Sequence, residues 1–228
     1  MNRTKSQASP QLSLYSSGVS AGKLQLLDDF IVPGKVLDIG CGNGLYGLHL
    51  ESRGCDVLQI DLADRRDELA RHLPFRIMDA QTPDFGDNEF DHVVAFDIME
   101  HLDDDVKFLQ TLRRVCRQRL FLSVPNADDV QIVDYGITHV HHKDKTHRRE
   151  YTMAQLESLL VDSGLKVLSI RPNFTIGLPL FARALAKDHL LAKVAAELVV
   201  LQCKAFMKVG LFENRTVGDW YCAAEKLA

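Results

Sequence analysis

Val36-Leu37-Asp38-Ile39-Gly40-Cys41-Gly42-Asn43-Gly44 is the stretch that decides the fold of this 228-residue chain. Its first residues are mostly apolar, as expected of a central strand that is covered on both faces. Gly40, Gly42 and Gly44 permit positive φ values and let the backbone approach a ligand closely, which a Cβ atom would obstruct. The apolar run 45–50 then predicts a helix whose first amide groups face that ligand. We therefore expect a strand, a glycine-rich turn and a helix built around a cofactor site.

The spacing of the glycines argues against a dinucleotide site. The fingerprint G-x-G-x-x-G needs its third glycine at position 45, where this chain has leucine. The stretch instead resembles the first motif, D-x-G-x-G-x-G, of class I S-adenosylmethionine-dependent methyltransferases. The resemblance implies an α/β fold with a Rossmann-like, seven-stranded, mostly parallel sheet whose last strand is antiparallel. It also implies S-adenosyl-L-methionine as cofactor, bound at this turn by Asp38, Gly40, Cys41, Gly42 and Gly44.

Composition and charge limit the class of protein. The formal net charge of -4 gives no general attraction to nucleic acid or anionic membranes. The five cysteines show no C-x-x-C spacing, which indicates reduced thiols and neither a disulfide framework nor a zinc site. We find no signal-peptide core and no uncharged apolar run of about 18 residues. A cytoplasmic protein is expected.

Acidic residues follow the next two expected strands, 55–60 and 75–78. A carboxylate at the tip of the strand beside the glycine turn can accept hydrogen bonds from both ribose hydroxyls, which is the role we expect for Asp61. The alternative is that Asp61 caps a helix, although Asp64 is an equally good cap for the helix expected at 65–73. In the resembled family, the corresponding positions also contact the ribose and the adenine edge; here they are Leu62, Asp79 and Ala80.

The fourth expected strand, 90–96, ends in a segment that lies beside the sulfonium in the resembled family. Phe96 or Asp97 would bound the methionine end of the cofactor. Asp97, Glu100 and His101 are spaced i, i+3 and i+4, so they share one face if this turn is helical. Ubiquinone-pathway and small-RNA 2′-O-methyltransferases bind a divalent metal here with Glu-x-x-Glu-His, and this chain has Asp97 in place of the first glutamate. The alternative is that Glu100 and His101 only begin the helix expected at 103–117.

Four of the nine histidines fall between positions 139 and 147, among lysines and arginines. One interpretation is a solvated loop. The other is a cap over the acceptor site, in which His142 or His147 acts as general base or as a further metal ligand. Glu100 and His101 are the other candidate bases. The basic cluster is also the only ground for RNA as acceptor.

The rest of the chain completes the expected domain, 18–228. Residues 1–17 are expected to be flexible. A helix at 21–31 would place Tyr15 and Lys23 near the cofactor in the resembled family; the alternative is an ordinary packing helix with a solvated lysine. Further strands are expected at 119–124 and 165–170, and an antiparallel last strand begins at Asp219. The capping box Thr152–Gln155 predicts a helix between them.

The segment 178–212, with charges spaced by four, is expected to be a helical insert between the sixth and seventh strands. It is expected to be a substrate lid or a dimer contact, or to lie on a membrane surface. The oligomeric state, monomer or homodimer, stays open.

We predict methyl transfer to a small-molecule acceptor, possibly at oxygen, because the chain has no dedicated recognition domain and no strong basic face. Nucleic acid is not the expected partner. Two alternatives remain, a nicotinamide-dependent oxidoreductase and a non-catalytic protein that binds the cofactor or a partner.

Overall fold

The computed structural model describes residues 19–127, 144–172 and 218–227 with their side chains, and the backbone of 173–176 and 216–217. Residues 194, 195, 197, 198, 201, 202 and 205 are also described, and all are helical. The expected N-terminal segment 1–17, Tyr15, His142 and most of the insert 178–212 lie outside the described residues. Among the residues described, no helix combines the length and apolar character needed to cross a membrane.

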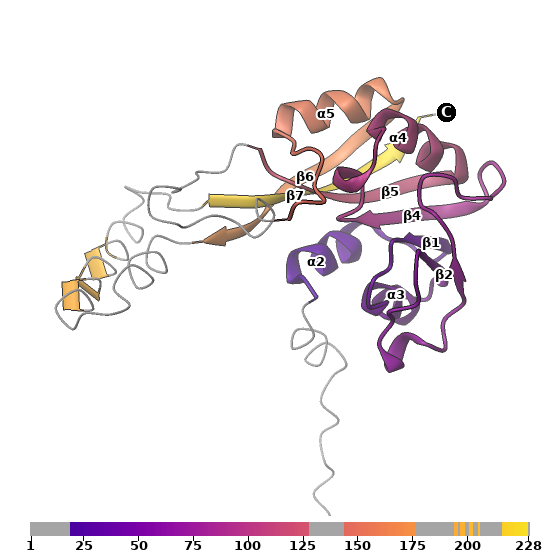
Figure 1. Cartoon of the computed structure of the whole chain (residues 1–228), viewed down its shortest axis with the longest axis horizontal. Coiled ribbons are helices and arrows are strands. Elements are labelled where there is room, and N and C mark those ends of the chain that lie inside the picture. The colour runs from indigo at the N-terminus through magenta and orange to yellow at the C-terminus, as the bar shows by residue number, and fades with distance from the viewer. Residues whose placement is uncertain are drawn as a thin grey trace, which may run out of the picture.

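The described strands form one seven-stranded sheet, shown in Figure 1. Its order is β3-β2-β1-β4-β5-β7-β6, and β7 runs antiparallel to both of its neighbours. The predicted fold class is therefore confirmed. The strands are β1 Lys35–Ile39, β2 Asp56–Asp61, β3 Phe75–Ile77, β4 Phe90–Phe96, β5 Cys116–Pro125, β6 Leu165–Ile176 and β7 Thr216–Lys226.

Helices cover both faces of this sheet (Figure 1). Leu26 and Leu27 of one helix pack with Val36 on one face, whereas Leu109 of another packs with Leu37 on the other. Successive side chains of a strand point to opposite faces, so an apolar run such as that of β1 supplies both cores. The helices are α2 Ala21–Phe30, α3 Leu45–Ser52, α4 Asp105–Val115 and α5 Met153–Asp162, with 3₁₀ turns η1 Glu68–Ala70 and η2 Met99–His101.

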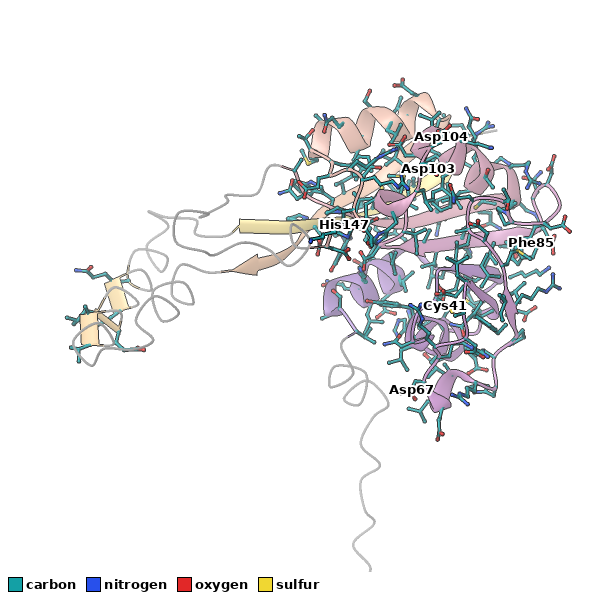
Figure 2. The ribbon with its side chains drawn as sticks, viewed as in Figure 1. Cys41, Asp67, Phe85, Asp103, Asp104 and His147 are labelled. Carbon is teal, nitrogen blue, oxygen red and sulfur yellow. The ribbon has the colours of Figure 1, made fainter. Side chains whose placement is uncertain are left out.

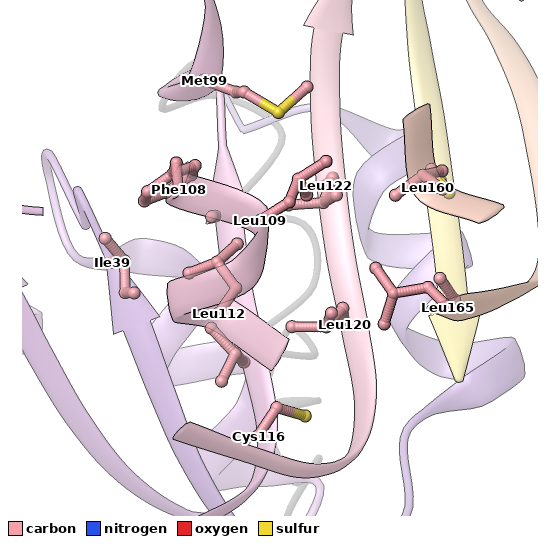
Figure 3. Close-up of a cluster of buried hydrophobic side chains, with 14 of the residues drawn as sticks. Ile39, Met99, Phe108, Leu109, Leu112, Cys116, Leu120, Leu122, Leu160 and Leu165 are labelled. Carbon is pink, nitrogen blue, oxygen red and sulfur yellow. The ribbon is translucent and has the colours of Figure 1, made fainter. Parts of the chain in front are cut away.

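The larger core lies under α4 and α5 (Figure 3). Phe108, Leu109 and Leu112 of α4 are buried against Leu120 and Leu122 of β5. Apolar burial of this kind stabilises the fold by about 25 cal/mol for each Å² removed from water. Packing on both sides of β4 and β5 therefore holds the carboxyl ends of these strands, where the candidate site lies, in a fixed position.

The prediction of a helix at 65–73 is wrong, since only the 3₁₀ turn η1 forms there. The backbone N–H of Asp67 donates to Asn43 O at 2.9 Å and does not enter a helical ladder. The Arg66 guanidinium donates to the carbonyl oxygens of Ala70 and Leu73 at 3.3 and 2.8 Å. These carbonyls are therefore used by a side chain, and the segment packs as an irregular connection.

The helix expected at 103–117 is shorter than predicted. The Asp104 side chain accepts from the Lys107 N–H, which caps α4 at its start, and the chain enters β5 already at Cys116. The predicted capping box is confirmed, because Thr152 and Gln155 each accept a hydrogen bond from the backbone of the other.

Candidate active site

The glycine turn joins β1 to α3 at the carboxyl end of the sheet. Gly40, Gly42 and Gly44 have φ values of 67°, 54° and 75°. The N–H groups of Gly40 and Cys41 donate to Ile60 O, at 2.8 and 3.1 Å. The Gly42 N–H donates to Asp61 Oδ2 at 2.9 Å. The acidic residue that ends β2 therefore fixes the shape of the turn.

Replacing Gly40 with alanine is expected to destabilise the protein by about 1–3 kcal/mol and to weaken cofactor binding. The added Cβ would lie 2.0 Å from Ile98 Cδ1, at a backbone φ of 67°. Gly42→Ala is the matched control, because its φ of 54° is similarly strained but its Cβ meets nothing within 4 Å. Urea unfolding of both variants separates the clash from the strain. Equal losses of stability would contradict the role of Ile98.

A buried polar pair lies beneath the turn. Gln59 Nε2 donates to Asp38 Oδ2 at 2.9 Å and to Gly44 O at 3.0 Å. Burial, with a further contribution from the Asp61 charge, raises the pKa of Asp38 to about 6. Asp38 therefore supports the turn from beneath, and it does not line the cavity that lies next to the turn.

Next to the turn is a cavity of about 530 Å³. This volume falls in the usual range for a small-molecule site. Six residues predicted to bind the cofactor line it: Gly40, Asp61, Leu62, Asp79, Ala80 and Asp97. His101 lines it as well, with Arg65, Met78, Gln81, Ile98, Leu102 and Thr146, which were not predicted.

The other predicted cofactor contacts are not among the lining residues. Cys41 is buried, and burial raises the pKa of its thiol. Phe96 is also buried, with its ring packed edge-on against Tyr46 at 5.1 Å between centroids. Of the alternatives Phe96 and Asp97, only Asp97 lines the cavity at the end of β4.

A second cavity, of about 270 Å³, adjoins the first and shares Asp97 and His101 with it. Its lining residues are Asp97, Glu100, His101, Pro125, Asp144, His147 and Asp219. Four carboxyl groups and two imidazoles therefore surround a small space (His147 is labelled in Figure 2). Asp219 could have been found from sequence, because the amino end of an antiparallel strand lies beside the carboxyl ends of parallel ones.

The spacing had predicted that Asp97, Glu100 and His101 share one face of a helical turn. In the structure Asp97 does not share a face with the other two. It precedes η2 and adopts a φ of 55°. Its carboxylate pairs with the Lys23 ammonium and accepts from Ser123 Oγ at 2.5 Å. Partial desolvation would raise the pKa of Asp97, whose side chain is 53% exposed, but Lys23 and Ser123 hold this pKa below the usual range. Asp97 is therefore ionised and held by two partners.

Lys23 was expected either to contact the cofactor or to be a solvated lysine of a packing helix. It is only 5% exposed, and it lies on α2 with its Nζ within 5.9 Å of the ring centroids of Tyr46, Phe96 and Tyr221. Aromatic faces attract a cation in this geometry. Lys23 is thus a buried cation that joins α2 to the end of β4.

Glu100 is 2% exposed, and its Oε2 accepts no hydrogen bond from the described residues. Burial, reinforced by the charge of Asp97, raises the pKa of Glu100 to about 8. A carboxyl group with this pKa can both hold and release a proton near neutral pH.

The two histidine rings at the site meet edge-on, with 4.7 Å between the centroids of His101 and His147. Thr146 Oγ1 donates to Asp144 Oδ1 at 2.6 Å and lies 2.9 Å from His101 Nδ1. Because the hydroxyl has a single proton, this network assigns the Nδ1–H tautomer to His101 and leaves its Nε2 as an acceptor. Burial and the neighbouring His101 lower the pKa of His147.

Glu100, His101 and His147 form a possible metal-binding group, with one ligand atom from each within 4.8 Å of the others. The sequence had suggested Asp97, Glu100 and His101, with His142 or His147 as a possible further ligand. In the structure His147 joins the group in place of Asp97, whose oxygens are held by Lys23 and Ser123. No local pattern could have shown that Asp97 leaves the group, because its contacts with Lys23 and Ser123 are distant in sequence.

A family model described as a methyltransferase domain matches residues 15–170. The chain is 32% identical over 136 residues to a probable S-adenosylmethionine-dependent methyltransferase of Mycobacterium tuberculosis, covering 57% of this chain and 47% of that protein. It therefore spans about half the length of this relative. It is also 27% identical over 173 residues to the ubiquinone biosynthesis O-methyltransferase of Aeromonas salmonicida, covering 63% and 71% of the two chains.

Among solved structures, the chain resembles the 1,6-didemethyltoxoflavin-N1-methyltransferase of Burkholderia thailandensis, with a TM-score of 0.60. The two are 16% identical, and the match covers 99% of this chain and 94% of that one. That structure contains 1,6-didemethyltoxoflavin and S-adenosylhomocysteine. At this identity the likeness shows the fold alone.

Proposed function

Since the chain belongs to the methyltransferase-domain family of class I S-adenosylmethionine-dependent enzymes, we propose that it transfers a methyl group from S-adenosyl-L-methionine to an oxygen of a small molecule. The observation that carries this proposal is the pair of adjoining cavities that share Asp97 and His101. Methyl transfer is an in-line displacement, so its main requirement is that two reactants meet in one orientation. Two cavities with a common wall supply this arrangement.

The larger cavity is the proposed cofactor site. Asp61 accepts hydrogen bonds from the ribose hydroxyls, and Asp79 accepts one from the adenine amine. Asp97, held ionised by Lys23, lies at the boundary between the cavities and favours the positively charged sulfonium. The amide groups at the start of α3 add a favourable field for the carboxylate of the methionine end.

The smaller cavity is the proposed acceptor site. An acceptor hydroxyl placed there loses its proton to Glu100, whose pKa of about 8 suits a general base near neutral pH. The acceptor oxygen attacks the methyl carbon, the carbon–sulfur bond breaks, and its electron pair stays on the sulfur of S-adenosylhomocysteine. His101 Nε2 and His147 hold the acceptor oxygen in line with the methyl group.

The donor set also fits a divalent cation. Glu100, His101 and His147 would hold it, and the buried Glu100 Oε2, which lacks a partner among the described residues, would gain one. A cation bound there would lower the pKa of an acceptor hydroxyl coordinated to it. Metal dependence is part of the test below.

Calorimetric titration with S-adenosylhomocysteine, with NADH as the comparison, tests the cofactor. We expect saturable binding of S-adenosylhomocysteine and none of NADH. Binding of NADH alone would overturn the proposal in favour of an oxidoreductase.

Turnover is then assayed with phenols and catechols as acceptors, with Mg²⁺ or with a chelator. We expect S-adenosylhomocysteine release that depends on the acceptor. Cofactor binding without turnover of any hydroxyl or amine would indicate a non-catalytic binding protein, whereas turnover of amines alone would overturn the choice of oxygen.

A further inference from the structure

Residues 144–151, called the strap here, contact both cavities. Thr146 lines the larger cavity, and Asp144 and His147 line the smaller one. The strap also supplies the hydroxyl that fixes the tautomer of His101, 45 positions away in sequence. The position of the strap therefore decides where three of the site's polar side chains lie relative to the sheet.

The strap is attached to the start of α4 by two ion pairs that differ in exposure. Arg149 pairs with Asp105 at 2.8 Å, and these side chains are 27% and 20% exposed. Arg148 pairs with Asp103, where the side chains are 57% and 66% exposed. Exposed pairs contribute little because solvent screens them, so the Arg149–Asp105 pair is the stronger attachment.

Asp105 also binds the end of the strap. Its Oδ2 accepts from Tyr151 OH at 3.1 Å, while its Oδ1 accepts from the N–H of Val106 at 2.9 Å. Arg149 gains a second contact through Asp103 O at 2.8 Å. One carboxylate on the first turn of a helix with a buried face thus holds two side chains of the strap.

The backbone of the strap is hydrogen-bonded to η2, to the end of β5 and to Trp220 of β7. The Arg148 N–H donates to Glu100 O at 2.9 Å. Tyr151 N–H donates to Pro125 O at 3.0 Å, and Tyr151 O accepts from Trp220 Nε1 at 3.1 Å. A shift of the strap therefore changes the environment of Trp220, the single tryptophan of the chain.

We propose that Asp105 is a positioning residue that, through Arg149 and Tyr151, sets the position of His147 and Thr146 in the two cavities. It does not touch the reacting atoms. Its kinetic consequence depends on the proposed function, whereas its effect on the strap does not. Positional errors of about 1 Å at a reacting centre can lower rates up to a hundredfold. A small displacement of the strap is therefore enough to lower the rate of methyl transfer.

Asp105→Asn tests the proposal, with Asp103→Asn as matched control. Asparagine keeps the size of Asp105 and can still accept from Tyr151, but it loses the charge that holds Arg149. We expect kcat/KM for the acceptor to fall about tenfold in Asp105→Asn and to change less than about twofold in Asp103→Asn. Affinity for S-adenosylhomocysteine changes less than about threefold in both, because Asp61 and Asp79 are untouched.

Trp220 emission and its quenching by acrylamide give a second readout that needs no turnover. We expect a changed emission maximum and easier quenching in Asp105→Asn, and neither in Asp103→Asn. If wild-type protein shows no methyl transfer, this readout still tests the strap, so the two proposals fail separately.

Stability is checked by thermal unfolding. Should Asp105→Asn fail to fold, Arg149→Gln removes the same pair from the strap side and should give the same kinetic and fluorescence changes. Asp105→Glu should restore at least half of the lost kcat/KM. Unchanged fluorescence and kinetics in Asp105→Asn or Arg149→Gln, or equal changes in Asp103→Asn, would overturn the proposal.

Discussion

Glu100→Gln is expected to lower kcat for methyl transfer by about 10²- to 10⁴-fold, the usual contribution of general acid–base catalysis. Glutamine keeps the size of the side chain but cannot accept a proton. Stopped assays of S-adenosylhomocysteine formation at saturating acceptor measure the effect. Affinity for S-adenosylhomocysteine should stay within about threefold of wild type, because Glu100 does not line the larger cavity.

The same substitution should change how stability depends on pH. The pKa of Glu100 rises from 4.5 to about 8 on folding, so between these values the folded state binds more protons than the unfolded state. Stability therefore falls as pH rises through this window, by an amount on the order of a few kcal/mol. Glu100→Gln should remove this loss and be as stable as wild type or more stable at pH 8.

Urea unfolding between pH 5 and pH 8, in the presence of a chelator, measures this difference. Glu157→Gln is the control, because Glu157 is an exposed residue of α5 and lines neither cavity. A kcat within threefold of wild type would exclude Glu100 as the base. If Glu100→Gln and wild type showed the same pH dependence of stability, burial would not raise the pKa of Glu100 as described.

Asp61→Ala is expected to weaken binding of S-adenosylhomocysteine by about ten- to a hundredfold, the contribution of charge-assisted hydrogen bonds. Asp61 lines the larger cavity, and one of its oxygens holds the Gly42 amide. The affinity of Asp61→Asn for S-adenosylhomocysteine should lie between those of wild type and Asp61→Ala. The asparagine amide oxygen still accepts from Gly42 but carries no charge. Calorimetry measures all three proteins.

Asp56→Ala is the matched control, since Asp56 is an exposed aspartate at the opposite end of the same strand, β2. It should bind S-adenosylhomocysteine as wild type does. If Asp61→Ala bound S-adenosylhomocysteine as tightly as Asp56→Ala does, the proposed role of Asp61 in binding the ribose would be wrong.

Local patterns in the sequence were sufficient to predict the fold and part of the lining of the larger cavity. The apolar run of β1 and the three glycines fixed a strand and a turn, because their requirements are met within a few residues. Asp61 and Asp79 line the cavity because parallel strands end at the same edge of the sheet. The family resemblance, supported by the match over residues 15–170, supplied the cofactor.

The remaining features depend on contacts between distant parts of the chain. The helix pattern at 65–73 failed because Arg66 and Asp67 bond to groups that the pattern does not include. Asp97 left the predicted helical face because Lys23, 74 positions earlier, holds it. Phe96 and Asp38 follow the family motif, yet their strands turn these side chains into the protein, away from the cavity lining.

The place of β7 in the sheet has a consequence for the order in which the protein can be assembled during synthesis. Among the described strands, β6 pairs only with β7, and β7 fills the position between β5 and β6. Chains grow from the amino end, so β6 emerges before its pairing partner in the sheet exists. Strands β1 to β5 can associate early, but β6 must wait until residues 216–226 have been made.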